Sequence, residues 1–210
     1  QYIDQHPHLH TVAVSDQNFT GSGKLADGTG FYSDLSDLLR EELDVLFVSL
    51  PNYLAAKATM AGLERGMHIF CEKPPARNLS EVEQVMKVEV QHPGLKLKYC
   101  FNHRYHLAVK EAYRMIQSGE LGKIINLVGV YGKSHIVPFD KGWRASREMA
   151  GGGILLDQGI HMVDLMRVFC GNFTQFQSFV SNNYWGHDVE DNAYVLMRTA
   201  SGQVGMLHSS

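Results

Sequence analysis

A lysine in the first half of the chain has the sequence context of a reactive group. Lys73 follows the apolar segment 67–71, which predicts a strand buried in a parallel sheet. Ligands of open α/β sheets bind at the carboxyl ends of the strands, and Pro74 restricts the backbone next to this lysine. The alternative is a solvated charge pair of Glu72 and Lys73 before a turn, and on spacing alone the two interpretations have about equal weight.

A carboxylate and an imidazole follow the triple glycine 151–153. Asp157 and His161 are four residues apart, so on a helix both side chains leave the same face, and Gly159 bares the backbone between them. A carboxylate near an imidazole can fix its tautomer and raise its basicity, which a general base requires. The alternative is an ordinary ion pair on a helix face. A metal site is less favoured, because this spacing supplies only two ligands.

An acidic residue and a glycine-rich segment occur near the start of the chain. Asp16 ends the apolar segment 9–15, and an acid there can bind the ribose hydroxyls of NAD and repel a 2′-phosphate. A turn-forming aspartate is the alternative. The segment Gly21–Ala26 fits a dinucleotide fingerprint only loosely, since no strand abuts it and the glycines after it prevent the required helix, so we expect a flexible loop there.

The first hundred residues alternate between apolar, β-branched segments and helical patterns. This alternation is typical of βαβ units with a parallel sheet. Strands are expected at 9–15, 44–50, 67–71 and 95–101, and helices at 53–65 and 80–90. Ser80 and Glu83 predict a capping box at the start of the second helix.

The second half has a different pattern. Helices are expected at 107–117 and 154–169, and strands at 124–131, 174–181, 193–199 and 204–209. Consecutive strands joined by short turns predict a mixed or mostly antiparallel open sheet. A domain boundary is therefore placed between Phe101 and Asn102.

Composition and charge exclude several classes of function. Nineteen Lys and Arg against 22 Asp and Glu give a net charge of −3, which provides no basic surface for a nucleic acid. No apolar run approaches the roughly 18 residues that span a bilayer, so no membrane association is expected. Three separated cysteines in apolar segments favour reduced thiols and a cytoplasmic location.

Six motifs in order resemble those of the Gfo/Idh/MocA family of glucose-fructose oxidoreductase and inositol dehydrogenase relatives. They are VAVSD, DVLFVSLPN with CEKP, FNHRYH, SGELGKI, GWR and GGGILLDQGIHMVDL. The resemblance implies α/β architecture, with an incomplete Rossmann domain (1–101) that lacks its first strand and glycine loop. An α+β domain (102–210) with an open, mostly antiparallel sheet follows. We expect the chain to be truncated at both ends.

The resemblance also implies roles for individual residues. His161 would take a hydroxyl proton, Lys73 would polarise the oxygen, and Asp157 would orient the site. The residues implied to bind cofactor are Asp16, Leu50, Pro51, Asn52, Glu72, Lys73 and Asn102. Those implied to bind substrate are Arg104, Trp143, Arg144, Asp157 and His161. The implied cofactor is NAD, with NADP possible, and no metal is expected.

These observations predict an NAD(P)-dependent dehydrogenase or reductase that acts on a CH–OH group of a sugar, polyol or nucleotide-linked sugar. We expect a homo-oligomer formed through the C-terminal sheet. Two alternatives stay open: a regulator that binds dinucleotide without turnover, and a metal-dependent hydrolase or lyase. The loop 132–150 and the face of the sheet are expected to determine the substrate.

Overall fold

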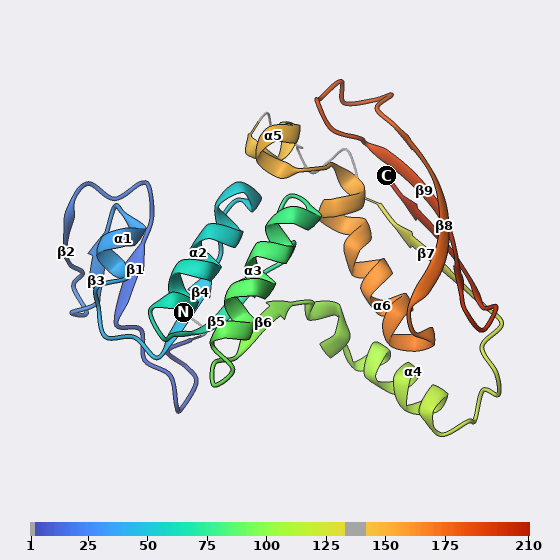
Figure 1. The fold of residues 1–210 in the computed structure, drawn as a ribbon, viewed down its shortest axis with the longest axis horizontal. Coiled ribbons are helices and arrows are strands. Elements are labelled where there is room, and N and C mark those ends of the chain that lie inside the picture. The colour runs from blue at the N-terminus through green and yellow to red at the C-terminus, as the bar shows by residue number, and fades with distance from the viewer. Residues whose placement is uncertain (1–2, 133–141) are drawn as a thin grey trace. The chain divides into compact units, whose positions relative to one another are not determined.

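The computed structural model describes residues 3–132 and 142–210, which form two compact units (Figure 1). The first unit comprises Gln1–Val48, Lys57–Cys71 and Gln84–Lys98, and the second comprises Ser49–Ala56, Glu72–Glu83 and Tyr99–Ser210. The chain therefore contributes three stretches to each unit. No helix in the described parts of the chain is long and apolar enough to cross a membrane.

The first unit contains a small mixed sheet of three short strands. In the order β1-β3-β2, β1 (Ala13–Ser15) runs parallel to β3 (Gly30–Tyr32), and β2 (Ser22–Lys24) runs antiparallel to β3. The one-turn helix α1 (Leu35–Leu38) follows, with Asp34 as its N-cap. The expectation of a flexible loop at Gly21–Ala26 is wrong, because pairing with β3 holds the middle of this segment as a strand.

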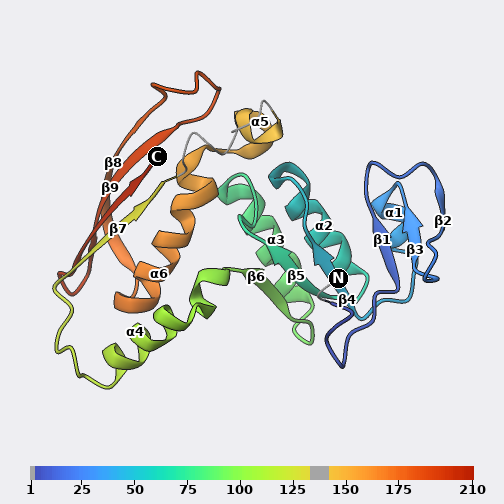
Figure 2. The same ribbon diagram turned by 180° about the vertical axis from the view of Figure 1, so that it is seen from behind.

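The second sheet of the chain is parallel, with strand order β4-β5-β6. Its strands are β4 (Val45–Val48), β5 (His68–Glu72) and β6 (Leu97–Cys100). Helices α2 (Asn52–Glu64) and α3 (Leu79–Gln91) connect consecutive strands and cover the same face of the sheet (Figure 1 and Figure 2). Two βαβ crossovers that turn in the same sense place both helices on one face. This confirms the predicted Rossmann-like parallel sheet.

Two details of the first hundred residues differ from the prediction. The strand near residue 14 pairs with β3 in a separate sheet rather than extending the parallel one. The cap of α3 lies two residues earlier than predicted, because Glu81 donates its backbone N–H to Asn78 Oδ1 over 3.0 Å. Glu81 Oε2 accepts the N–H of Arg77 at 2.9 Å, so Asn78 caps the helix and Glu81 bonds back to the residue that precedes the cap.

The second unit is built on a four-stranded sheet of order β7-β10-β9-β8. β7 (Asn126–Tyr131) runs parallel to β10 (Val204–Ser209), and β9 (Asn192–Thr199) is antiparallel to both β10 and β8 (Phe173–Ser181). This confirms the predicted mixed, mostly antiparallel sheet. The predicted long helix comprises a π-helical turn (Leu155–Gly159) and α6 (Ile160–Cys170).

Helix α6 covers one face of this sheet, and its core contact is made by methionine and leucine. Met166, Met197 and Leu207 are buried together. Gly129 in the sheet lets Met166 of the helix pack against its backbone, because a Cβ on Gly129 would lie 2.7 Å from Met166 Cε. The remaining helical elements are η1 (Asn102–Tyr105), α4 (Leu107–Gln117), η2 (Trp143–Ala145) and α5 (Arg147–Ala150).

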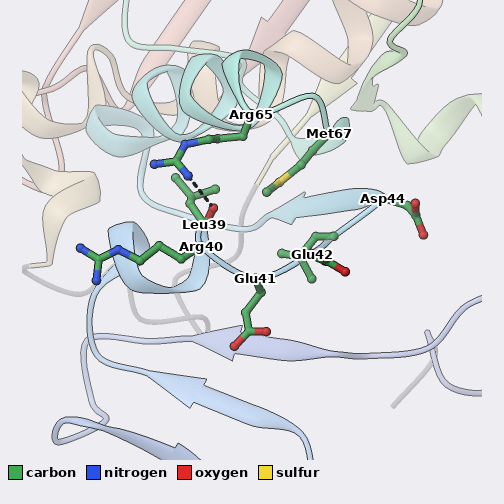
Figure 3. A pocket seen from close by; sticks show the side chains of 8 residues that line it. Leu39, Arg40, Glu41, Glu42, Asp44, Arg65 and Met67 are labelled. Atoms are coloured by element: carbon green, nitrogen blue, oxygen red, sulfur yellow. Dashed lines mark hydrogen bonds between the residues drawn. The ribbon is translucent and has the colours of Figure 1, made fainter.

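A polar hollow lies in the first unit (Figure 3). Arg65 crosses it and donates a hydrogen bond to the carbonyl of Leu39 at 3.3 Å. The lining residues are Leu39, Arg40, Glu41, Glu42, Leu43, Asp44, Arg65 and Met67. None of them is a predicted site residue, so this hollow is separate from the candidate functional site.

Candidate functional site

Lys73 and Asp157, 84 residues apart in sequence, are in direct contact. Lys73 follows the last residue of β5, and its peptide bond to Pro74 is cis. Its Nζ donates to the main-chain oxygen of Asp157 at 2.5 Å and to Asp157 Oδ1 at 3.3 Å. Both side chains are largely buried, with 14% and 15% exposed. The ammonium is therefore held by the π-helical turn, whereas Glu72 accepts the backbone N–H of Lys73, at 3.3 Å.

The carboxylate of Asp157 also has neighbours besides Lys73. Gln158 Nε2 donates to Asp157 Oδ2 at 2.9 Å, and Arg144 Nε lies 4.0 Å from Asp157 Oδ1. The guanidinium of Arg144 covers the ring of Trp143, with 4.3 Å from Cζ to the ring centroid. Both cations, Lys73 and Arg144, thus approach the same oxygen of the carboxylate, Oδ1. The structure brings the predicted Arg144 to the same place as Lys73 and Asp157.

His161 lies one turn further along, at the start of α6, and is 5% exposed. Its ring stacks on that of His103 with centroids 4.0 Å apart and planes 15° apart. Tyr131 and Phe101 complete the aromatic surroundings, at 6.2 and 6.3 Å. Within residues 3–132 and 142–210, His161 Nδ1 is buried and has no hydrogen-bond partner.

The electrostatic environment of His161 favours its neutral form. Burial, the ammonium of Lys73 and the ring of His103 lower the pKa of His161 to about 4, although Asp157 and Asp164 oppose this shift. Asp157 acts in the expected direction, since its carboxylate raises the pKa of His161, but burial, Lys73 and His103 outweigh it. The physical reason is that the carboxylate of Asp157 is hydrogen-bonded to Lys73 and Gln158 while the imidazole is buried.

Arg104 is held by a carboxylate of α6. Its Nε donates to Asp164 Oδ2 at 2.6 Å and a terminal N–H group donates to Oδ1, a bidentate pair. Asp164 is buried. Asp164 lies three residues after His161 in α6. The ion pair therefore fixes the guanidinium of Arg104, a predicted substrate-binding residue, to the helix that carries His161. Asn102, predicted to contact the cofactor, is the first residue of η1.

A buried side-chain amide at the start of α2 forms a hydrogen bond within the second unit. Asn52 begins α2, and its Nδ2 donates to the carbonyl of Ala150 at 2.7 Å. Pro51 contributes its carbonyl to the first helical turn, accepting from Leu54 N at 2.9 Å. Leu50 and Pro51 are partly buried beside it. The predicted cofactor-binding turn is therefore anchored to the residue that precedes the triple glycine.

The triple glycine permits two close backbone contacts. Gly151 has φ +84°, and a Cβ there would lie 2.2 Å from the carbonyl oxygen of Arg77. At Gly153 a Cβ would lie 1.9 Å from the carbonyl oxygen of Glu190. Glu190 also accepts from Gly153 N through Oε1 at 2.8 Å and from Ile154 N through its carbonyl at 3.0 Å. These bonds satisfy donors at the start of the helix that carries Asp157 and His161.

The carboxylate next to Glu190 organises the loop between β8 and β9. Asp191 is buried and accepts the backbone N–H groups of Asn183, Tyr184 and Trp185 at 3.1, 2.6 and 2.9 Å. Burial opposes ionisation of Asp191, but these N–H donors outweigh it and lower its pKa. The sequence analysis identified neither carboxylate, because no periodicity or turn signal indicates a buried acid there.

Asp16 belongs to the first unit. Its Oδ1 accepts from Asn18 N at 2.8 Å and from Asn18 Nδ2 at 2.7 Å, the geometry of a local turn. The turn-forming interpretation therefore describes what the structure shows, and binding of a ribose by Asp16 stays a prediction. Among the described residues, no group of three or more His, Cys, Asp or Glu is arranged to hold a metal ion.

Comparison with known protein families agrees with this architecture. Residues 1–97 match a family described as an oxidoreductase family with an NAD-binding Rossmann fold, and residues 109–210 match the GFO/IDH/MocA C-terminal domain. Since the two matches together cover nearly the whole chain, this chain belongs to the Gfo/Idh/MocA family of oxidoreductases. The family predicted from the sequence is thereby confirmed.

Individual relatives are sugar dehydrogenases. D-glucoside 3-dehydrogenase of Escherichia coli (strain K12) is 33% identical over 162 residues, which cover 74% of this chain and 45% of the relative. Levoglucosan dehydrogenase of Pseudarthrobacter phenanthrenivorans is 26% identical, with 94% of this chain and 58% of the relative covered.

A solved structure of levoglucosan dehydrogenase in complex with NADH and L-sorbose superposes with a TM-score of 0.85 at 25% identity, covering 95% of this chain and 58% of that one. The chain spans about half the length of the curated relatives it matches.

The contact between Gly153 and Glu190 yields a test of stability. Gly153→Ala should lower the free energy of unfolding by roughly 1–3 kcal/mol or more, because the added methyl forces the main chains apart. Urea denaturation followed by circular dichroism measures the change. The matched control is Gly94→Ala, where nothing lies within 4 Å of the new Cβ. Equal midpoints for the two variants would contradict the described close approach.

Proposed function

We propose that this chain is the dinucleotide- and substrate-binding part of an NAD(P)-dependent dehydrogenase or reductase. Its substrate is a secondary alcohol or ketone of a sugar, polyol or nucleotide-linked sugar. The observation that supports this most is the Lys73–Asp157 pair beside a buried, neutral His161. Membership of an oxidoreductase family and sugar dehydrogenases among the relatives support the reaction class and substrate class.

The residues present fit a nicotinamide cofactor. The turn Leu50–Asn52 and Lys73 follow the carboxyl ends of adjacent parallel strands, β4 and β5, where open α/β sheets bind dinucleotides. Bound NAD supplies the acceptor for the hydrogen and electron pair that leave the sugar carbon. Leu50, Pro51, Asn52, Glu72, Lys73 and Asn102 are the proposed cofactor-binding residues of this region, and Asp16 is proposed to bind the ribose.

The proposed roles of the catalytic residues follow from their hydrogen bonds. His161 is neutral, and a neutral imidazole has one unprotonated ring nitrogen, so His161 can accept the hydroxyl proton of the sugar. An ammonium has three N–H donors, and Asp157 takes up two of those on Lys73. The third is available to stabilise negative charge on the substrate oxygen. Asp157 holds the ammonium in place through these two bonds.

Substrate recognition is proposed to come from cations and aromatic rings near this pair. Arg144 and Trp143 form one stacked contact, and Arg104 is oriented by Asp164. Of the predicted specificity loop 132–150, residues 133–141 lie outside the described residues. The described part, 142–150, contributes Arg144 to the surroundings of Asp157.

Substitution of the two proposed catalytic residues tests the mechanism. In the full-length protein, His161→Ala should lower kcat by roughly 10²- to 10⁴-fold, the range for loss of a positioned proton acceptor. Lys73→Ala should cause a comparable loss, because it removes the charge at the reacting oxygen. NADH formation across a panel of sugars and polyols measures both, with Lys87→Ala on the exposed side of α3 as control.

The outcomes separate the competing functions. Dinucleotide binding without turnover of any sugar would favour the regulator. Turnover that requires an added metal and no dinucleotide would favour the hydrolase or lyase. Unchanged kcat in both variants would overturn the assigned roles.

Cofactor preference tests Asp16. The full-length protein should use NAD with a higher kcat/KM than NADP, because the carboxylate repels a 2′-phosphate. Asp16→Ser should reduce the difference between the two cofactors, and Asp27→Ser, at another exposed turn of the same unit, should leave it unchanged. Equal or better use of NADP by the wild type would contradict the role of Asp16.

Homo-oligomer formation is proposed through the face of the second sheet opposite α6. Strand register places six apolar side chains together on this face, each at least half exposed: Val128, Val130, Phe179, Tyr194, Leu196 and Met206. Exposed apolar patches of this kind mark interfaces, and a two-fold axis lets one patch cover its own copy. We therefore propose a second copy of the chain as the occupant.

A charge on this face should separate the copies. Leu196→Glu should halve the molar mass in solution, measured by analytical ultracentrifugation, because an unpaired carboxylate would be buried in the interface. Leu107→Glu, on the exposed surface of α4, is the matched control and should leave the mass unchanged. The same mass for wild type and Leu196→Glu would contradict the interface.

A further inference from the structure

His103 is the closest aromatic neighbour of His161 and has no role in the proposed reaction so far. It lies in η1, and its ring contacts three others. His161 stacks on it at 4.0 Å, His106 lies at 5.0 Å and Tyr131 at 5.5 Å, measured between ring centroids. Tyr131 is itself 6.2 Å from His161, so the rings of His103, Tyr131 and His161 form one packed cluster.

Among the described residues, no carboxylate is hydrogen-bonded to His161 to explain its orientation. A histidine that accepts protons is commonly oriented by an acid on its other nitrogen. Here the two nearby acids are bonded elsewhere: Asp157 accepts from Lys73 and Gln158, and Asp164 accepts from Arg104. Within the described residues, Nδ1 of His161 has no partner at all. Among the contacts of the described residues, stacking on His103 can fix the plane of the ring.

The charges around the two imidazoles disfavour their joint protonation. His161 faces Lys73, His103, Asp157 and Asp164, whereas His103 faces His106, Lys73 and Asp164. The pKa of His103 is also lowered, first by burial and then by His106 and Lys73. Two imidazolium rings stacked at 4.0 Å would repel each other beside an ammonium, so the two rings together carry at most one positive charge near neutral pH.

We propose that His103 is a positioning residue: its ring holds the plane of His161 by stacking and keeps His161 neutral at pH values where an isolated histidine would carry a proton. This inference rests on the proposed function, in which His161 accepts the hydroxyl proton. The reaction loses this acceptor when His161 is protonated, so activity should fall as the pH drops through the pKa of His161. His103 therefore extends activity toward acidic pH.

Two substitutions separate stacking from charge. His103→Phe keeps a flat ring against His161 and removes the titrating nitrogen, whereas His103→Ala removes both. The ring of His161 is followed by NMR in the full-length protein with isotope-labelled histidine, and its signal is assigned through His161→Phe. His10→Phe, at an exposed site of the first unit, is the control. The NMR titration needs no turnover, so it can succeed or fail independently of the proposed enzyme activity.

The expected results differ between the variants. In the wild type His161 should titrate near its low value of about 4. His103→Phe should raise this midpoint, because a neighbouring positive charge is lost, and should keep kcat at neutral pH within about threefold, since the ring remains stacked. His103→Ala should raise the midpoint further toward the ordinary histidine value of about 6.5, because water reaches the ring, and should lower kcat by roughly tenfold. The acid limb of the kcat/KM profile should move upward in the same order.

Three outcomes would overturn the proposal. One is a midpoint for His161 that is the same in wild type, His103→Phe and His103→Ala. Another is an unchanged kcat in His103→Ala. The third is an equal loss in the Phe and Ala variants with a raised KM for sugar, which would make His103 a direct substrate contact. Thermal unfolding checks that each variant is folded, and the Phe variant keeps the test decisive if the Ala variant is not.

Discussion

The bond from Lys73 Nζ to the main chain and carboxylate of Asp157 is the constraint on which the site depends. It requires the residue after β5 to meet a helix that begins more than eighty residues later. Backbone must pass unusually close to backbone for this, and only glycine at 151 and 153 permits it. Glu190 then caps the start of the helix, so the π-helical turn and α6 have one fixed position relative to Lys73.

The electrostatics of the second unit follow from that geometry. Asp157 is used to hold cations, so it is not available to His161, and Asp164 is used to hold Arg104. The imidazole is left buried among aromatic rings with an ammonium nearby, and it is therefore neutral. The positive charges near the site are therefore those of lysine and arginine, and the histidine is uncharged.

The sequence predicted the site best where local signals coincide with tertiary position. Lys73 was found because a buried parallel strand ends just before it, and Asp157 and His161 because glycine and helical spacing surround them. His103 and Asp191 were missed, since their roles arise from contacts with residues 58 and about eight positions away that carry no periodic signal. β2 was missed for the same reason: a short polar segment becomes a strand only through pairing with β3. The cap at Asn78 was misplaced by two residues because Ser80 and Glu83 have the same spacing as Asn78 and Glu81.

Two adjacent acids, Glu190 and Asp191, hold different parts of the second unit in place. Glu190 fixes the helix of the site, and Asp191 fixes the backbone of the loop that bears Tyr184 and Trp185. Both anchors lie at the end of the loop, so two adjacent residues hold both the loop backbone at 183–185 and the start of the helix at 153–154. A substitution of a loop side chain that preserves these backbone bonds therefore leaves the helix that carries Asp157 and His161 in place, so the loop surface can vary without a change in the site.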